Sequence, residues 1–223
     1  MGDAPLADHL QVNGEGMARR GWRGARASAG VLCLLGFLSL YAVAVRTVAG
    51  QRYDAEIFGA AQRVPFGGHA QIPRVGVPLT LLGVLCGCVL VALRRRRGQA
   101  IFCAAASCLL TVAAAAAAQQ VLGRPRLGAF AYPYNTYPSD HVAVTAALGL
   151  AVLMLWPRPR WFGQMLLGVV ALVWMACVYN VVGFAHRPSD VLGGVMLAGG
   201  VAAVVVAVVG LGPSIPSGRQ QSV

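Results

Sequence analysis

Long apolar runs constrain the fold of this chain more than any other feature. Lipid offers no water to an unpaired backbone group, so segments that cross a membrane fold as helices or closed barrels. A helix needs about 20 apolar residues to cross about 30 Å of hydrocarbon. The sequence therefore predicts an all-α, polytopic membrane protein, a bundle of six transmembrane helices. Their expected positions are residues 28–45, 75–93, 99–122, 142–156, 162–182 and 191–211.

The composition agrees with a membrane protein. Hydrophobic residues make up 57% of the chain and charged residues 11%, against about 25% charged residues in soluble domains. All 18 basic residues are arginine, and they give a net charge of +11. They cluster between the apolar runs, so we interpret them as topology anchors and contacts for anionic membrane lipids and expect no nucleic-acid partner. The abundance of Ala, Gly and Val is typical of a GC-rich bacterial genome.

The six cysteines all lie inside apolar runs, where we expect packed thiols without disulfides or a metal ion. They are Cys33, Cys86, Cys88, Cys103, Cys108 and Cys177.

Three segments follow from this pattern. Residues 1–26 are polar and Gly-rich, which predicts a disordered cytoplasmic tail. Residues 27–211 form the predicted six-helix domain, and residues 212–223 a second cytoplasmic tail. Eleven arginines fall on the side of the two termini and seven on the other, and Arg94–Arg97 belongs to the larger set. The positive-inside rule then predicts a plasma-membrane protein with both termini in the cytoplasm.

Three polar islands interrupt the apolar runs, and this topology places all of them on the external face. They are Arg124-Pro125-Arg126, Tyr137-Pro138-Ser139-Asp140-His141 and His186-Arg187-Pro188-Ser189-Asp190. The spacing from His186 to Asp190 is one helical turn. The carboxylate could then accept a proton from one imidazole nitrogen and leave the other as a nucleophile or base.

The other islands offer an anion site and a proton donor. Arg124, held by Pro125, presents a planar fork suited to phosphate oxygens. Backbone amides around Asp140, at a helix start, could add an anion site, although Ser139 and Asp140 can also be simple helix caps. His141 could protonate a leaving group. Together these groups predict phosphoryl transfer.

The order Arg-Pro, Pro-Ser-x-His and His-x-x-x-Asp, over residues 75–211, resembles the type 2 phosphatidic acid phosphatase (lipid phosphate phosphatase) superfamily. The resemblance implies that His186 attacks phosphorus to form a phosphohistidine while Asp190 orients it. His141 would protonate the departing oxygen and later activate water, and Arg124 and Ser139 would hold the phosphate. No metal or other cofactor is expected in that scheme.

The sequence departs from the family pattern at three points. It has no lysine before the Arg-Pro pair, Asn180 stands where the family usually has arginine, and Asp140 where it usually has glycine. Arg126 and Arg187 are candidate phosphate ligands that could restore the lost charge, or they are anchors for headgroups.

Two functions stay open. One is hydrolysis of a lipid phosphate or pyrophosphate at the external leaflet. The other is a catalytically impaired member that binds or moves lipid phosphates. The segment 46–74, which contains Asp54, is a candidate partial lid. The choice of lipid and the oligomeric state are left open.

Overall fold

The structure is a computed structural model that describes residues 4–63, 71–127, 134–183 and 185–210. The described part is mostly helical and contains no strand, which confirms that the fold is all-α. Its elements are α1 (Ala4–Leu40), the π-helical turn η1 (Tyr41–Val45), α2 (Val48–Gln62), α3 (Gln71–Arg94), α4 (Gly98–Val121), α5 (Asp140–Leu155), the short 3-10 turn η4 (Pro159–Trp161), α6 (Phe162–Val182) and α7 (Pro188–Val209).

Several of these helices are suited to a membrane, and the protein is membrane-embedded by that criterion. Five helical segments of the described part are long and apolar enough to cross: Gly21–Val45, Gln71–Arg94, Gly98–Val121, Pro159–Val182 and Pro188–Val209. The remaining apolar helix, α5, has only 16 residues. It is shorter than the roughly 20 residues that a full crossing needs. The predicted count of six spans therefore stays a prediction.

Helix α1 differs from expectation at its beginning. It starts at Ala4, so it runs through most of the segment for which the sequence predicts a disordered tail. After Pro5 this segment contains no proline that would interrupt a helix. Its glycines each cost only about 1 kcal/mol in a helix, so the apolar helix that follows can extend backwards through them. The cytoplasmic location of this segment stays a prediction.

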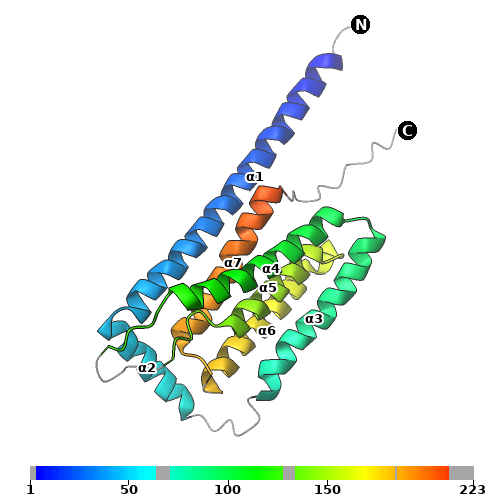
Figure 1. Cartoon of the computed structure of the whole chain (residues 1–223). Helices are drawn as coiled ribbons and strands as arrows, with labels where there is room; N and C mark the ends of the chain where they lie inside the picture. The colour runs from blue at the N-terminus through cyan, green and yellow to red at the C-terminus, as the bar shows by residue number, and fades with distance from the viewer. Residues whose placement is uncertain (1–3, 64–70, 128–133, 184, 211–223) are drawn as a thin grey trace.

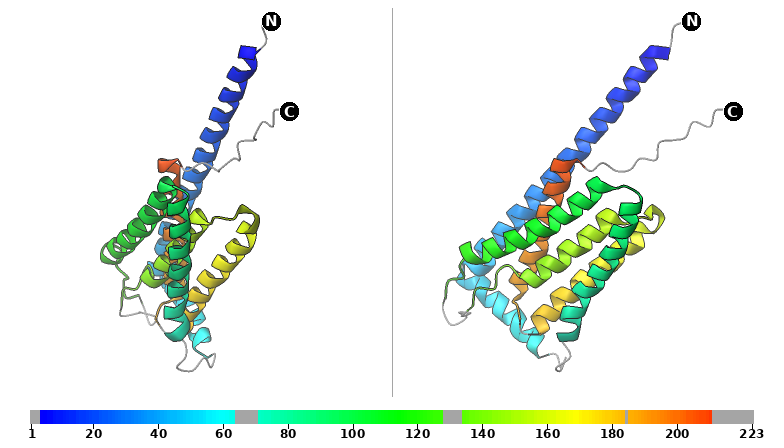
Figure 2. Two further views of the ribbon diagram at one scale, coloured as in Figure 1. Left: turned by 90° about the vertical axis from the view of Figure 1, so that its right-hand side faces the viewer. Right: turned by 45° about the vertical axis from the view of Figure 1, so that its right-hand side comes forward.

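Helix α5 occupies the centre of the bundle. It packs against α3, α4, α6 and α7, as the views in Figures 1 and 2 show. Nine of its 16 residues are buried, and they are distributed around the helix rather than along one face. A helix that is apolar all round is one that neighbours cover on every side. The central helix therefore holds its first residues, Asp140 and His141, in a fixed position relative to all four neighbours.

Two glycines let α7 approach the polar island at the start of α5. A Cβ atom at Gly194 would lie 2.7 Å from the Ser139 carbonyl oxygen and 3.0 Å from the Ala143 nitrogen. A Cβ atom at Gly193 would lie 2.6 Å from the Tyr137 ring. This close approach lets the Ser139 N–H donate a hydrogen bond to the Asp190 carbonyl oxygen at 2.9 Å. The glycines thus join the second and third islands.

We expect Gly194→Ala to lower the melting temperature and the activity of the purified protein. The added methyl group meets backbone atoms that cannot move aside, and overpacking of this kind typically costs about 1–3 kcal/mol. Gly199→Ala on the same helix is the matched control, because its Cβ atom would meet only Cys33 Sγ, at 3.8 Å. Melting curves that are the same for the two variants would contradict the packing described here.

All three islands lie at one end of the bundle, beside α2 (Figure 1). The turns from α3 to α4 and from α5 to α6 lie at the opposite end. There Arg95 Nη1 donates to the Pro157 carbonyl oxygen at 3.1 Å, and α1 begins and α7 ends on the same side. The islands therefore converge in space as the order of the helices predicts. Which end faces the outside of the cell stays a prediction.

Candidate active site

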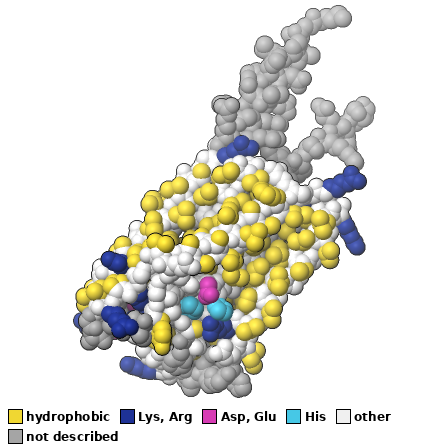
Figure 3. All heavy atoms as spheres, in the orientation of Figure 1, with side chains coloured by type: hydrophobic (Ala, Val, Ile, Leu, Met, Phe, Trp, Pro, Cys, Tyr) yellow, Lys and Arg dark blue, Asp and Glu magenta, His cyan; other side chains and the backbone are white. Residues whose placement is uncertain are grey.

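Two histidines and an aspartate meet at the surface of this end. The ring centroids of His141 and His186 are 6.3 Å apart. Asp140 lies between them, with its Oδ1 atom 2.9 Å from His141 Nδ1 and 3.8 Å from His186 Nε2. The side chains of Asp140 and His141 are about half exposed, while that of His186 is 8% exposed. Figure 3 shows histidine and acidic side chains together on this face. The site is open to a ligand.

The ring of His186 is held with one nitrogen toward the site. Its backbone N–H donates to the Asn180 carbonyl oxygen at 3.1 Å, which ties it to the end of α6. Its Nδ1 atom is buried and has no hydrogen-bond partner among the described residues. Nδ1 lies 3.9 Å from Asp190 Oδ2, beyond hydrogen-bonding range. Nε2 is the nitrogen on the side of Asp140, so it is the atom that can react.

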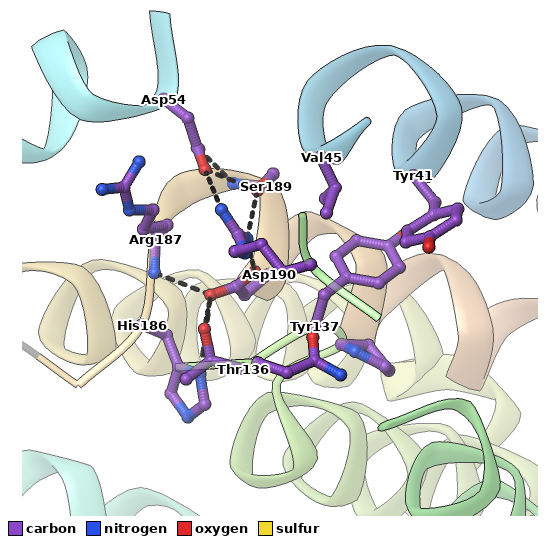
Figure 4. A network of polar contacts seen from close by, with 12 residues as sticks. Tyr41, Val45, Asp54, Thr136, Tyr137, His186, Arg187, Ser189 and Asp190 are labelled. Atoms are coloured by element: carbon purple, nitrogen blue, oxygen red, sulfur yellow. Dashed lines mark hydrogen bonds and ion pairs between the residues drawn. The ribbon is translucent and has the colours of Figure 1, made fainter. Parts of the chain in front are cut away.

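Asp190 does not form the hydrogen bond to His186 that the spacing of the two residues predicts. Its carboxylate accepts hydrogen bonds from other groups. Its Oδ1 accepts from Arg124 Nη2 at 2.5 Å. Its Oδ2 accepts from Thr136 Oγ1 at 2.5 Å and from the Arg187 N–H at 3.0 Å (Figure 4). Both carboxylate oxygens are therefore occupied, which explains the longer distance to His186. Asp190 acts on the imidazole through its charge and through the rigidity of this network.

Arg124 is the centre of a buried ionic cluster. Its side chain is fully buried, with Nη1 3.4 Å from Asp54 Oδ2 and Nη2 3.5 Å from Ser189 Oγ. Ser189 donates from its backbone N–H to Asp54 Oδ1 at 2.9 Å and from its hydroxyl to Oδ2 at 2.7 Å. Burial raises the pKa of Asp54, and the negative charge of Asp190 raises it further. One guanidinium thus compensates two carboxylates.

The helix α2 forms the outer wall of this cluster. Gln51 Nε2 donates to the carbonyl oxygens of Val45 at 2.8 Å and Pro125 at 2.7 Å. Arg187 Nη1 donates to the Gln51 carbonyl oxygen at 3.4 Å. Gln51 and Asp54 are both buried and lie on one face of α2. The candidate lid segment is therefore, in its described part, a helix docked on the first and third islands.

The structure separates the predicted phosphate ligands. Arg124 is engaged by Asp54 and Asp190. Figure 4 shows the Arg187 guanidinium pointing away from the His186 ring. Arg126 is exposed and has no hydrogen bond or ion pair among the described residues. Ser139 is buried, and its Oγ accepts from the Val142 N–H at 3.4 Å, which makes it the N-cap of α5.

The burial of His186 favours its neutral form. Burial lowers its pKa below the ordinary value of 6.5, and the nearby charges of Arg74 and His141 act in the same direction. Asp190 and Asp140 oppose this effect. A neutral imidazole has the lone pair that a nucleophile needs. Arg74, in the first turn of α3, was not among the candidates from the sequence.

An apolar cavity of about 380 Å³ opens beside Asp140 and His141, between α3, α4 and α5. Apolar side chains form most of its wall, with polar groups at one end. The lining residues are Pro78, Val112, Ala115, Ala116, Gln119, Asp140, His141 and Val144. Gln119 also donates to the Pro138 carbonyl oxygen at 2.8 Å, which links α4 to the second island. The cavity can hold an apolar group next to His141.

One set of side chains in the described part has donor atoms close enough to share a metal ion. The ligand atoms of Asp140, His141 and His186 lie within 4.8 Å of one another. Two imidazoles and a carboxylate are ligands that transition metals accept. The positive charge of Arg74 at this site opposes a cation. The expectation of a metal-free site stays a prediction.

Fold and site together define a polytopic helical membrane protein with a paired-histidine site. The chain belongs to the PAP2 superfamily, whose family model matches residues 80–211. The match includes all three polar islands and confirms the resemblance to type 2 phosphatidic acid phosphatases. Members of this superfamily are phosphatases, which supports a phosphatase-type activity on phosphate esters. Comparison with curated proteins and with solved structures gave no significant match.

The family match begins after several residues that shape the site. Gln51, Asp54 and Arg74 all precede residue 80. Sequence reasoning gave none of them a role in the site. The three-residue spacing of Gln51 and Asp54 is the signal that could have indicated a polar helix face. No comparable pattern surrounds Arg74.

Proposed function

We propose that this protein is a membrane phosphatase that removes phosphate from a lipid phosphate or pyrophosphate, with His186 as the nucleophile. The observation that carries the proposal is the pair of histidines, 6.3 Å apart, one of which, His141, lines an apolar cavity. A neutral, largely buried imidazole and a second, exposed imidazole are suited to different roles. The first can attack phosphorus, and the second can exchange protons with the leaving oxygen and with water.

The reaction has two steps. In the first, the lone pair of His186 Nε2 forms a bond to phosphorus, the bond from phosphorus to the bridging oxygen breaks, and His141 donates a proton to that oxygen. In the second, His141 takes a proton from water, the water oxygen forms a bond to phosphorus, and the bond from phosphorus to His186 Nε2 breaks, which releases inorganic phosphate and regenerates His186. Asp140 accepts the Nδ1–H of His141 at 2.9 Å and so directs Nε2 of that ring toward the site.

A lipid is the substrate that suits the surroundings of the site. The cavity wall is mostly apolar, and two of the three helices that form it, α3 and α4, are long enough to cross a membrane. The phosphate group would sit at the helix ends, at headgroup depth. From the arginine distribution we place this end at the external leaflet of the plasma membrane, with both termini in the cytoplasm.

Phosphate release from purified protein in detergent tests the activity. Suitable substrates are phosphatidic acid, phosphatidylglycerol phosphate and a polyprenyl pyrophosphate, each assayed with and without EDTA. We expect release that EDTA does not affect. Binding of these lipids without release from any of them would favour the alternative of a non-hydrolysing lipid-phosphate binder. One observation favours that alternative, since the Asp140 carboxylate lies 3.8 Å from His186 Nε2, where a phosphate dianion would approach.

Thiol labelling on intact cells tests the orientation. We expect a cysteine in place of Tyr134, which is 67% exposed, to react with a membrane-impermeant reagent. A cysteine in place of Arg160, exposed at the other end of the bundle, should react only after permeabilisation. The unsubstituted protein reports any background from the native cysteines. The opposite labelling pattern would reverse the topology.

A further inference from the structure

The proposed site carries negative charge that needs a cation beside the substrate. Asp140 is in the site, and a phosphate dianion would add to its charge. Two arginines of the polar islands, Arg124 and Arg187, are directed elsewhere. Arg124 is buried between Asp54 and Asp190, and Arg187 points away from His186 (Figure 4). Asn180 is buried, and its side chain donates to the Ala176 carbonyl oxygen at 2.8 Å.

Among the described arginines, Arg74 is placed by its helix close to this site. It lies in the first turn of α3, one helical turn before Pro78, which lines the cavity together with Asp140 and His141. Residues four apart lie on the same face of a helix. Its guanidinium is close enough to His186 to act on the imidazole by charge repulsion.

One hydrogen-bond donor of Arg74 has no acceptor in the part of the chain that the structure describes. Its Nε atom is buried and has no hydrogen-bond partner among the described residues. A buried donor without a partner is costly, so such a group is satisfied by water or by a ligand. A guanidinium with a free Nε–H can bind two phosphate oxygens at once through its fork geometry. An acceptor of that kind is what the proposed reaction brings to this place.

We propose that Arg74 binds the phosphate of the substrate and supplies the positive charge that the family motifs provide from other positions. This inference rests on the proposed function for the identity of its ligand. Arg74 precedes the region matched by the family model. The substrate site would then be formed by three helices, namely α5 with His141, α7 with Asp190 and α3 with Arg74.

Arg74 also affects the titration of the nucleophile. The charged and titratable groups that face His186 are Asp190 from α7, Asp140 and His141 from α5, and Arg74 from α3. The positive charge of Arg74 lowers the pKa of His186. Without it, that pKa should rise, and the acid limb of kcat/KM should move to higher pH. A residue with only a structural role would not move this limb.

The test compares Arg74→Met with Arg74→Lys and with Arg63→Met, an exposed arginine at the end of α2. Hydrolysis of phosphatidic acid and its inhibition by inorganic phosphate are measured in detergent. For Arg74→Met we expect the KM and the inhibition constant of phosphate to rise about ten- to a hundred-fold, the effect of one charge-assisted contact. The lysine variant should recover part of the loss, and Arg63→Met should match the unsubstituted protein. Because Arg74 Nε has no partner to lose, melting temperatures should stay similar.

The outcomes separate this inference from the proposed function. If the protein hydrolyses lipid phosphates and Arg74→Met behaves like Arg63→Met in phosphate inhibition and pH profile, the role of Arg74 is overturned and the proposed function stands. If the protein hydrolyses none of them, the proposed function is wrong. The binding of inorganic phosphate then tests whether Arg74 is a phosphate ligand. Inorganic phosphate should then raise the melting temperature of the unsubstituted protein but not of Arg74→Met. An equal rise in both would overturn the inference.

Discussion

His186→Gln should abolish phosphate release, lowering kcat by at least about a thousand-fold, because removal of a nucleophile leaves only the catalysis from binding and charge. Glutamine is close in size and can still occupy the space between Asp140 and Asp190. The melting temperature should therefore change little. The measurement is the steady-state release of phosphate in detergent with phosphatidic acid as substrate.

His141→Gln is the companion variant. Loss of a general acid and base typically lowers the rate about a hundred- to ten-thousand-fold, so this variant should retain more activity than His186→Gln.

Burial of His186 lowers its pKa below 6.5, and a nucleophile must be unprotonated. The acid limb of kcat/KM should therefore lie below pH 6.5. Full activity in His186→Gln, with its fold intact, would contradict the assignment of the nucleophile.

Arg124→Met should destabilise the protein strongly. Arg124 is the cation between two buried carboxylates, Asp54 and Asp190. Breaking a buried ion pair by removing one partner typically costs about 3–5 kcal/mol, since the remaining charges stay in an apolar surrounding. We expect a large fall in melting temperature in detergent and a low yield of folded protein.

Asp54→Asn is the matched control for that prediction. It keeps the size of the side chain and removes the carboxylate whose pKa burial raises, and Asp190 still pairs with Arg124. We expect a much smaller change in melting temperature than for Arg124→Met. If Arg124 were mainly a phosphate ligand, as the family resemblance implies, Arg124→Met would keep its stability and lose only activity. That result would contradict the cluster described here.

The helices and the convergence of the islands could be predicted from the sequence because both depend on local patterns. Apolar length indicates a membrane helix, and the order of the helices places the islands at one end. The spacing of six residues from Asn180 to His186 and that of one helical turn from His186 to Asp190 are also local features of the sequence. From such local patterns we could predict the two histidines that the structure brings together.

The partners of the polar groups could not be predicted in the same way. Asp54 bonds Ser189 across 135 residues of sequence, and nothing near either residue indicates the other. The spacing of His186 and Asp190 permits a hydrogen bond, yet the carboxylate oxygens of Asp190 accept hydrogen bonds from Arg124 and Thr136 instead. Competition among buried donors and acceptors is decided by the whole fold. Sequence spacing shows only which contacts are possible.

The covalent intermediate is the central claim of this account. The direct measurement is a rapid quench of purified protein with a substrate that carries a radioactive phosphate, followed by identification of the labelled residue. The account predicts a phosphohistidine at His186 in the unsubstituted protein. It predicts slower appearance of that label in His141→Gln, which lacks the proton donor of the first step, and none in His186→Gln. Turnover without label at His186 in either the unsubstituted protein or His141→Gln, or the same label in His186→Gln, would contradict it.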